Sequence, residues 1–380
     1  MTADLARHET LLQRLAGKGQ YRTLSAACGI DFTSNDYLGL AGSPQLRRSV
    51  IDALEKGVPV GAGGSRLLRG NHPEHEALEL EAAAFFKAER MLYFGSGYLA
   101  NLAVTATLPQ RSDLIVHDSL VHASMLAGIA ASRAAAVAVP HNDLDAFDAA
   151  IGRWRQSGGK GQAWIAVESL YSMDGDQAPL KALADLADRH GSFLIIDEAH
   201  ATGVHGPGGQ GLAAGLEGRD NIVTVHTCGK ALGCSGALVG APDVLCDILV
   251  NRARPFIYAT APSPLAAASV REALRILAAE PERRATLKEL TSFANACLTQ
   301  RLGIACSGSQ ILPVVIGDVG RTLRIAERMR EHGFDIRAIR PPTVARGTAR
   351  LRLSITLNVD MAAIARMIDC LSEVIREEVP

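Results

Sequence analysis

Two apolar runs in the middle of the chain, at 193–196 and 222–225, lead into chemically reactive polar residues. A carboxylate and an imidazole follow the first run, and a hydroxyl and an amine follow the second: Asp197, His200, Thr227 and Lys230. In a parallel α/β sheet the carboxyl ends of the strands meet at one edge, where ligands bind. The sequence therefore predicts a ligand site that combines these four side chains.

Strand-like and helix-like periods alternate along most of the chain, which is typical of a sheet covered by helices. The expected strands are Met91–Phe94, Leu114–His117, Ala135–Val139, Trp164–Glu168, Phe193–Asp197, Ile222–Thr227 and Ala237–Gly240. Helical runs lie between them, such as Pro73–Lys87, Leu180–His190 and Val244–Arg254. We therefore predict the α/β class, with a large, mostly parallel-sheet domain.

The length of 380 residues suggests about two domains. Residues 1–45 read as a helical arm followed by an extended segment, and residues 46–264 as the large α/β domain. Residues 265–380 read as a smaller α+β domain. Its expected strands are Ile311–Ile316, Asp335–Ile339 and Ala349–Ile355.

The composition argues against several functions. A net charge of −1 gives no overall field that would attract nucleic acid or an anionic membrane. No apolar stretch reaches the roughly 18 residues that suggest a membrane span. Seven scattered cysteines are typical of a reducing compartment, and residues 1–10 carry no targeting signal. We expect a cytoplasmic protein without a metal site, since Cys228 and Cys234 have no histidine at ligand spacing.

A lysine that follows a buried strand beside an acid, an imidazole and a hydroxyl suits pyridoxal phosphate (PLP), which is held through a Schiff base. The chain has seven lysines and 32 arginines, so Lys230 has few competitors. Gly95-Ser-Gly-Tyr98 follows a predicted strand and begins a helical run, where backbone amides bind phosphate. This segment is either an ordinary turn or, together with Thr227, a phosphate site that includes Gly97 and Tyr98.

Other residues have both a structural and a functional interpretation. His122 follows the strand that ends at His117, and it either caps a helix or stacks on a cofactor ring while handling a proton. Ser172 either stabilises a turn or hydrogen-bonds the cofactor. Arg350 and Arg352 project to the same side of a strand, and one of them is a candidate clamp for a substrate carboxylate.

Two motif matches point to other functions but lack the required context. Gly206–Gly211 fits the dinucleotide pattern G-x-G-x-x-G, but it follows no strand directly, contains Pro207 and lacks the later acidic residue. The segment 197–200 spells the acidic box of nucleic-acid-dependent ATPases. Those enzymes need a phosphate loop, and here Ala231 follows Gly229-Lys230 where a serine or threonine is required.

The motifs around these residues also identify a family. They are Ser34-Asn-Asp-Tyr-Leu-Gly39, Gly64-Ser-Arg-Leu-Leu-Arg-Gly70 with His75 and Leu78-Glu79, Ser169-Leu-Tyr-Ser-Met-Asp-Gly-Asp176, Asp197-Glu-Ala-His-Ala-Thr-Gly203 and the Lys230 segment. On them the chain resembles the α-oxoamine synthases, PLP enzymes of fold type I, over nearly its whole length. The stretches 339–344 and 347–352 are similar to the members that act in biotin biosynthesis. The family usually has an aromatic residue and a glycine where this chain has Cys228 and Ala231.

The resemblance implies an acyltransferase that condenses L-alanine with a pimeloyl thioester, with loss of carbon dioxide. The thioester would come from coenzyme A or an acyl carrier protein, and the enzyme would be a homodimer. The implied catalytic residues are Lys230, His122 and Asp197. The implied cofactor-binding residues are Gly97, Tyr98, Ser172, Asp197, His200, Thr227, Lys230 and Thr260, the last reaching the site of the other subunit. The implied substrate-binding residues are Arg22, His122, Thr343 and Arg352.

Other functions on the same fold remain alternatives. Sibling enzymes join glycine or serine to other acyl thioesters, and only the substrate pair accepted distinguishes them. A non-catalytic partner subunit would be expected to lose its lysine, whereas Lys230 is present. A PLP-binding regulator would need a DNA-binding domain, and the amino-terminal arm is too short and not basic.

Overall fold

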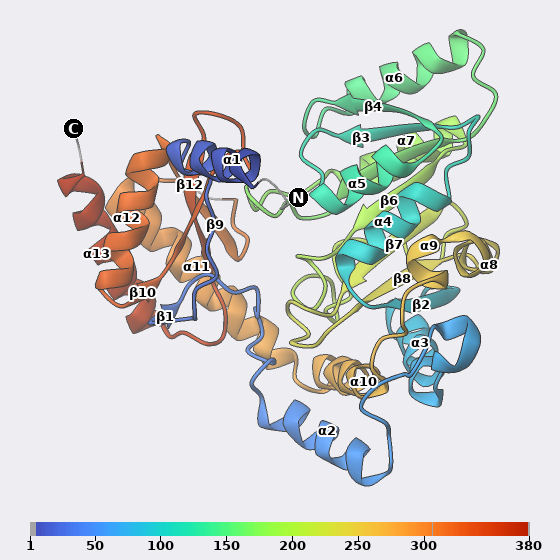
Figure 1. Cartoon of the computed structure of the whole chain (residues 1–380), viewed down its shortest axis with the longest axis horizontal. Coiled ribbons are helices and arrows are strands. Elements are labelled where there is room, and N and C mark those ends of the chain that lie inside the picture. Colours follow the sequence, from blue (N-terminus) through green and yellow to red (C-terminus); the bar gives the residue numbers. More distant parts are fainter. Residues whose placement is uncertain (1–4, 306, 379–380) are drawn as a thin grey trace. The chain divides into compact units, whose positions relative to one another are not determined.

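The computed structural model describes residues 5–305 and 307–378. Their contacts divide the chain into two compact units (Figure 1). The smaller unit contains the chain up to Ser34, the short segment Met173–Gly175 and the chain from Leu287 onwards, and the larger unit contains the rest. The domain boundaries expected at residues 45 and 264 stay predictions.

A seven-stranded sheet forms the centre of the larger unit (Figure 1). Its strands, in spatial order, are β2 (Arg90–Phe94), β8 (Ala237–Ala241), β7 (Ile222–Thr227), β6 (Phe193–Asp197), β5 (Ala163–Glu168), β3 (Leu114–Asp118) and β4 (Ala135–Val139). All neighbouring pairs are parallel except the two that β8 makes with β2 and β7. The mostly parallel sheet confirms the predicted α/β class.

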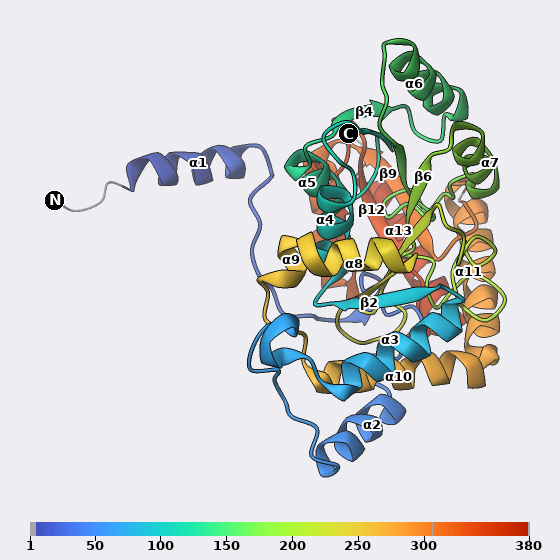
Figure 2. The same cartoon turned by 90° about the vertical axis from the view of Figure 1, so that its right-hand side faces the viewer.

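Helices cover both faces of this sheet. The helices of the larger unit are α2 (Pro44–Glu55), α3 (Pro73–Phe86), α4 (Gly97–Thr107), α5 (Ala123–Ala131), α6 (Leu144–Gln156), α7 (Leu180–His190), α8 (Asp243–Arg252), α9 (Arg254–Ile257) and α10 (Pro264–Ala279), with a π-helical turn at Arg66–Gly70. One apolar core joins the sheet to α4, α5, α8 and α9, which Figure 2 shows beside one another. A second core joins the other face to α6 and α7.

The alternation of side chains along each strand fixes which face the site residues occupy. On β6, Ile195 packs with α4 and α5, whereas its neighbours belong to the opposite core. Asp197 lies two residues further on and therefore projects toward α4 and α5. The same argument, from Val225 on β7, places Thr227 on that face.

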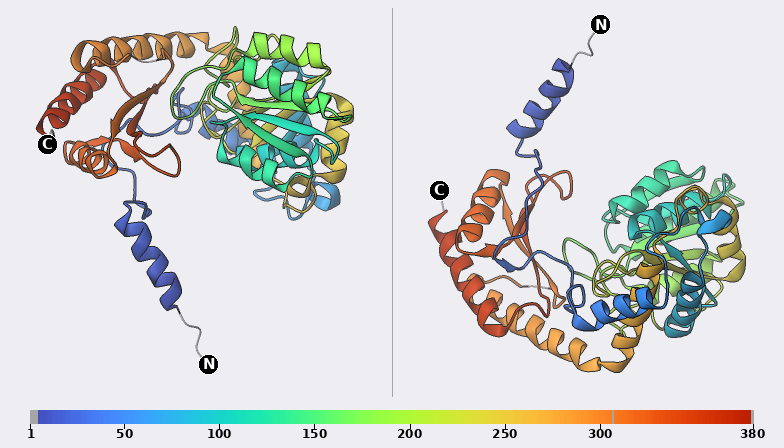
Figure 3. Two further views of the ribbon diagram at one scale, coloured as in Figure 1. Left: turned by 90° about the horizontal axis from the view of Figure 1, so that it is seen from above. Right: turned by 60° about the horizontal axis from the view of Figure 1, so that its bottom comes forward.

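The smaller unit has an antiparallel sheet in the order β11 (Arg337–Ile339), β12 (Ala349–Ser354), β9 (Ile311–Gly317). Helix α12 (Val319–Glu331) packs against all three strands, and α13 (Met361–Glu377) packs against α12 (Figure 3). Its other helices are α1 (Ala6–Gly17) and most of α11 (Pro281–Leu302).

The strand expected at Asp335–Ile339 is divided in two. Phe334–Asp335 forms β10 and pairs in parallel with β1 (Ile30–Asp31), whereas Arg337–Ile339 pairs with β12. The two halves thus have different partners, and the first ties the amino-terminal segment into this unit. Among the helices of the described residues, none has the length and apolar character needed to cross a bilayer.

Candidate active site

Lys230 lies three residues beyond β7 and meets the imidazole that follows β6. Its Nζ is 2.7 Å from Nε2 of His200, and Nδ1 of that ring is 2.6 Å from the hydroxyl of Tyr37. The Tyr37 hydroxyl is also 3.0 Å from Oδ1 of Asn35. If the tyrosine donates to this amide and His200 donates from Nδ1, then Nε2 accepts a hydrogen bond from Nζ of Lys230. The imidazole thus connects Lys230 to the Asn35–Tyr37 segment.

Asp197, at the end of β6, is 3% exposed and holds two hydrogen-bond donors. The side-chain amide of Asn101 donates to Oδ2 over 2.6 Å, and the backbone N–H of Ala199 donates to Oδ1 over 2.8 Å. Buried carboxylates need such donors because burial removes their hydration. Asp197 is therefore a fixed negative charge on the face of the sheet that α4 covers.

His122 occupies the N-cap of α5, and the same Asn101 connects it to Asp197. Nδ1 of His122 accepts from the backbone N–H of Ser124 at 3.3 Å and is 2.7 Å from its hydroxyl. The Asn101 amide also donates to this hydroxyl, over 3.0 Å. Desolvation lowers the pKa of His122 below its usual value, opposed by the charge of Asp197 and assisted by Lys230. Because Nδ1 accepts, the neutral ring carries its proton on Nε2.

The residues expected to bind phosphate lie where α4 begins. Gly97 is its first residue, and a side chain there would place a Cβ 3.3 Å from Oγ1 of Thr227. Ser96 caps the helix by accepting from the N–H of Leu99, and Tyr98 is half exposed. The first N–H groups of a helix have no partner within it and bind anions. Gly97 and Thr227 therefore lie close together on the same face as Asp197, where an anion could bind.

A second carboxylate, Glu168 at the end of β5, lies next to Asp197 in the parallel register. It is 2% exposed and accepts from the backbone N–H of Ser172 over 3.2 Å. Burial, with the negative charge of Asp197 as the next cause, raises the pKa of Glu168 well above its usual value. Its hydrogen bond positions the turn that carries Ser172.

The other residues expected at the site are Thr260, Arg22, Thr343 and Arg352. Thr260 is exposed in the larger unit. In the smaller unit, Arg22 donates to the hydroxyl of Thr343 over 3.3 Å, which brings two expected substrate contacts together. Arg352 is buried and donates to the Ser354 hydroxyl over 2.7 Å, whereas the neighbouring Arg350 pairs with the carboxylate of Asp174.

Sequence reasoning assigned no role to Asn101, Ser124 or Glu168, and Tyr37 entered only as part of a motif. Two signals could have identified them. Asn101 is four residues after Gly97, which places both on one helix face, and its side chain is polar within an apolar run. Glu168 ends a buried strand, as Asp197 does. Cys228 and Ala231, where the chain differs from the usual residues of the family, are both buried.

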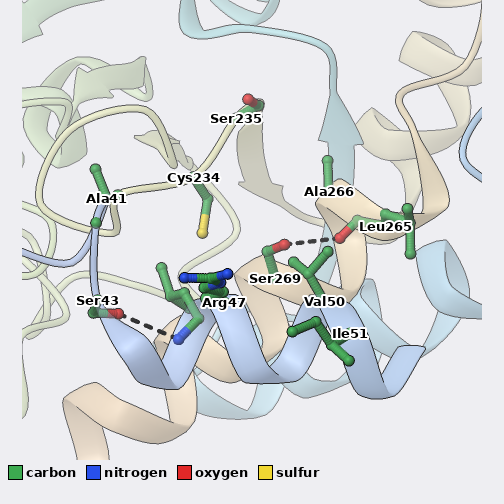
Figure 4. Close-up of a pocket in the computed structure, with 13 residues that line it drawn as sticks. Ala41, Ser43, Arg47, Val50, Ile51, Cys234, Ser235, Leu265, Ala266 and Ser269 are labelled. Carbon is green, nitrogen blue, oxygen red and sulfur yellow. Dashed lines mark hydrogen bonds between the residues drawn. The ribbon is translucent and has the colours of Figure 1, made fainter. Parts of the chain in front are cut away.

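A cavity of about 560 Å³ lies beside this cluster rather than in it. It is lined by α2, the start of α10 and the loop after Lys230, and Figure 4 shows Arg47 and Cys234 pointing into it. None of the expected site residues lines this cavity. Burial raises the pKa of the Cys234 thiol to about 12, so it is protonated and unreactive at neutral pH.

The residues brought together fit PLP. A lysine, a carboxylate and a helix N-terminus beside a hydroxyl match the aldehyde, the ring nitrogen and the phosphate of that cofactor. Oδ1 of Asn101 is also buried and has no hydrogen-bond partner among the described residues. A buried amide oxygen without a partner is costly, and it lies beside Asp197 where a ligand would be bound.

Comparison with known proteins supports the same assignment. Residues 28–371 match the model of the aminotransferase class I and II family. An 8-amino-7-oxononanoate synthase of Anaeromyxobacter dehalogenans is 42% identical over 354 residues, which are 92% of this chain and 87% of that protein. The crystal structure of 8-amino-7-oxononanoate synthase from Francisella tularensis superposes with a TM-score of 0.76 at 28% identity, covering 92% of this chain and 98% of that one.

A serine palmitoyltransferase solved with PLP superposes with a TM-score of 0.89 at 25% identity and covers 98% of both chains. The chain therefore belongs to the aminotransferase class I and II family, in the α-oxoamine synthase branch that contains the 8-amino-7-oxononanoate synthases.

Proposed function

We propose that this chain is a PLP-dependent acyltransferase of biotin biosynthesis that condenses L-alanine with a pimeloyl thioester. The products are 8-amino-7-oxononanoate, carbon dioxide and the free thiol of coenzyme A or an acyl carrier protein. The observations that carry the proposal are that Lys230 contacts His200 and that the charges of Lys230 and Asp197 both act on His122, in a chain 42% identical to a synthase of that name.

Bound PLP supplies an electron sink for the pair of electrons left when a bond to the amino acid Cα breaks. Lys230 would hold the cofactor covalently, and as a free amine it could take the Cα proton of the substrate. The contact with His200 Nε2 orients the Lys230 side chain. Lys230 therefore acts first as an anchor and then as a base.

Asp197 would pair with the ring nitrogen of the cofactor and keep it protonated. Two opposite unit charges about 4 Å apart interact by about 4 kcal/mol at an effective dielectric constant of about 20. That energy corresponds to about three pKa units. The donors from Asn101 and Ala199 hold the carboxylate in place for this role.

The other residues bind and orient. His122 would stack on the cofactor ring, and its Nε2–H could donate a hydrogen bond to the thioester oxygen during condensation. His200 and Ser172 bind the ring hydroxyl, and Gly97, Tyr98 and Thr227 bind the phosphate. Arg352 would bind the amino acid carboxylate, and Arg22 and Thr343 would bind the acyl substrate.

A homodimer and a cytoplasmic location belong to this proposal. The larger unit exposes several large apolar side chains close together in sequence, among them Val60, Leu67 and Leu68, 70%, 48% and 84% exposed. Exposed apolar groups of this kind suit an interface. Exposed Thr260 is available to reach the phosphate of the other subunit.

Thiol release from pimeloyl-coenzyme A tests the proposed function. PLP-loaded protein is given L-alanine, glycine or L-serine in turn, and we expect release with L-alanine alone. Release with glycine or L-serine instead would assign a sibling reaction. Silence with all three, repeated with pimeloyl-acyl carrier protein, would contradict the proposal.

A further inference from the structure

A histidine outside the site described so far lies between two carboxylates. Nδ1 of His141 is 3.0 Å from both oxygens of Asp118, and Nε2 is 2.7 Å from Oδ2 of Asp176. The next residue, Asn142, binds the same two carboxylates, with its backbone N–H 2.7 Å from Asp118 and its side-chain amide 2.9 Å from Asp176. The ring also meets Tyr171 edge-on, with centroids 4.4 Å apart.

The geometry determines the charge of this ring. An ionised carboxylate only accepts hydrogen bonds, so a ring with a carboxylate at each nitrogen must carry a proton on both. His141 is therefore an imidazolium between Asp118 and Asp176. In agreement, the two carboxylates raise the pKa of His141 to about 10, against the opposing effect of burial.

The two carboxylates belong to two different loops of the site. Asp118 ends β3, and its Oδ1 also accepts from the N–H of Leu120, which shapes the turn leading to His122 at the start of α5. Asp176 closes the turn after β5, where its backbone carbonyl accepts from the N–H of Tyr171. Ser172 is the next residue in that turn.

We propose that His141 is a positioning residue whose imidazolium holds the loops after β3 and β5 together, so that His122 and Ser172 are presented to the cofactor at fixed positions. This inference rests on the proposed function. His141 itself touches neither cofactor nor substrate, and it acts through Asp118 and Asp176. Without the cation, two carboxylates facing each other would repel and spread the loops.

His141→Gln tests the inference, because glutamine hydrogen-bonds but carries no charge. We expect kcat to fall about 10- to 100-fold, the range that follows when a catalytic group is displaced by about an ångström. The visible circular dichroism of bound PLP should also change, since it reports how the protein orients the ring. KM for the pimeloyl thioester should stay unchanged.

His190→Gln is the matched control. Nε2 of His190 is 2.5 Å from Oδ1 of Asp148, and the His190 side chain is 21% exposed, against 25% for His141. This pair joins α6 to α7 and does not include the loops that carry His122 and Ser172. This variant should match the wild type in kcat and in dichroism. Asp176→Asn, which removes one of the two charges without changing size, should shift both readouts in the direction of His141→Gln, by less.

The outcomes separate the two proposals. Wild-type protein that gives no visible PLP signal would overturn the proposed function and this inference together. If the wild type gives a visible PLP signal and His141→Gln changes neither that signal nor kcat, the positioning role alone is overturned. A drop in melting temperature with kcat and dichroism both unchanged would make His141 a purely structural residue and overturn it as well.

Discussion

The two faces of β7 carry polar clusters of different kinds. On the face away from α4, His226 is fully buried, with Nε2 2.7 Å from Glu217 and Nδ1 2.8 Å from the hydroxyl of Thr202. Thr224 donates to the other oxygen of Glu217, and the ring of Phe86 stacks on His226 at 3.9 Å between centroids. Every polar side-chain atom of His226 and Glu217 has a partner within the protein.

On the opposite face, the cluster around Asp197 is incomplete. Oδ1 of Asn101 and Oε1 of Glu168 are buried without a hydrogen-bond partner among the described residues, and Lys230 is partly exposed. A closed polar network stabilises a fold, whereas buried polar atoms left without partners cost stability and suit a ligand. The comparison therefore assigns stability to the His226 cluster and chemistry to the Asp197 cluster, and each assignment can be tested.

Lys230→Ala should have the largest effect. Loss of the covalent anchor and of the base together should lower kcat by about 10⁴-fold or more, and it should abolish the visible absorbance of covalently held PLP. The melting temperature of the cofactor-free protein should hardly change. Lys181→Ala, at a side chain 91% exposed, is the matched control. Full activity of Lys230→Ala would end the assignment of the site.

Glu217→Ala should have the opposite profile. It leaves His226 buried without its carboxylate, and breaking one side of a buried pair costs about 3–5 kcal/mol. Urea unfolding measures that loss, while kcat per folded molecule should stay at the wild-type value. Asp148→Ala, which breaks the partly exposed pair with His190, should cost at most about 1 kcal/mol. A selective loss of kcat in Glu217→Ala would erase the distinction between the two faces.

Asp197→Asn removes the negative charge of the Asp197 cluster while it keeps the size of the side chain. Asparagine keeps the size and one acceptor oxygen but no longer keeps the ring nitrogen protonated, so kcat should fall about 10²- to 10³-fold, the scale of about three pKa units. PLP should still bind, which its absorbance reports, and unfolding should change little. Normal turnover would show that Asp197 is not the partner of the ring nitrogen.

Features that depend on neighbouring residues in the sequence could be predicted, whereas contacts between distant segments could not. The strands and the reactive residues at their ends are local patterns, so β6 and β7 and the placement of Asp197 and Thr227 could be predicted. The pairing of β1 with β10 joins residues about 300 positions apart and leaves no local signal. The link from Asp197 through Asn101 to Ser124 depends on how α4 and α5 pack on the sheet, which no periodicity specifies.

His122→Gln should show whether the active cluster includes an uncharged imidazole. The pKa of His122 is lowered, mainly by desolvation, so the ring is neutral at pH 7 and gains its proton only on the acid side of about 6.5. We expect kcat/KM of the wild type to fall as pH drops through an apparent pKa below that value. The variant should lose this acid limb and about 10²-fold in kcat at pH 7. An acid limb that persists in the variant would assign it to another group.

Gly97→Ala should have the smallest effect and tests the edge of the active cluster. The added Cβ would lie 3.3 Å from Oγ1 of Thr227, so helix and hydroxyl must separate by a few tenths of an ångström. Phosphate held between them should bind less tightly, and we expect the Kd for PLP to rise a few-fold, about 1 kcal/mol.

Gly152→Ala in α6 is the matched control, because nothing lies within 4 Å of the added Cβ. It should raise stability by up to about 1 kcal/mol through helix propensity and leave PLP affinity unchanged. Equal PLP affinity in both variants would move the phosphate site away from the start of α4, while a selective loss in Gly97→Ala would confirm that the cluster open to ligand extends from Lys230 to this helix.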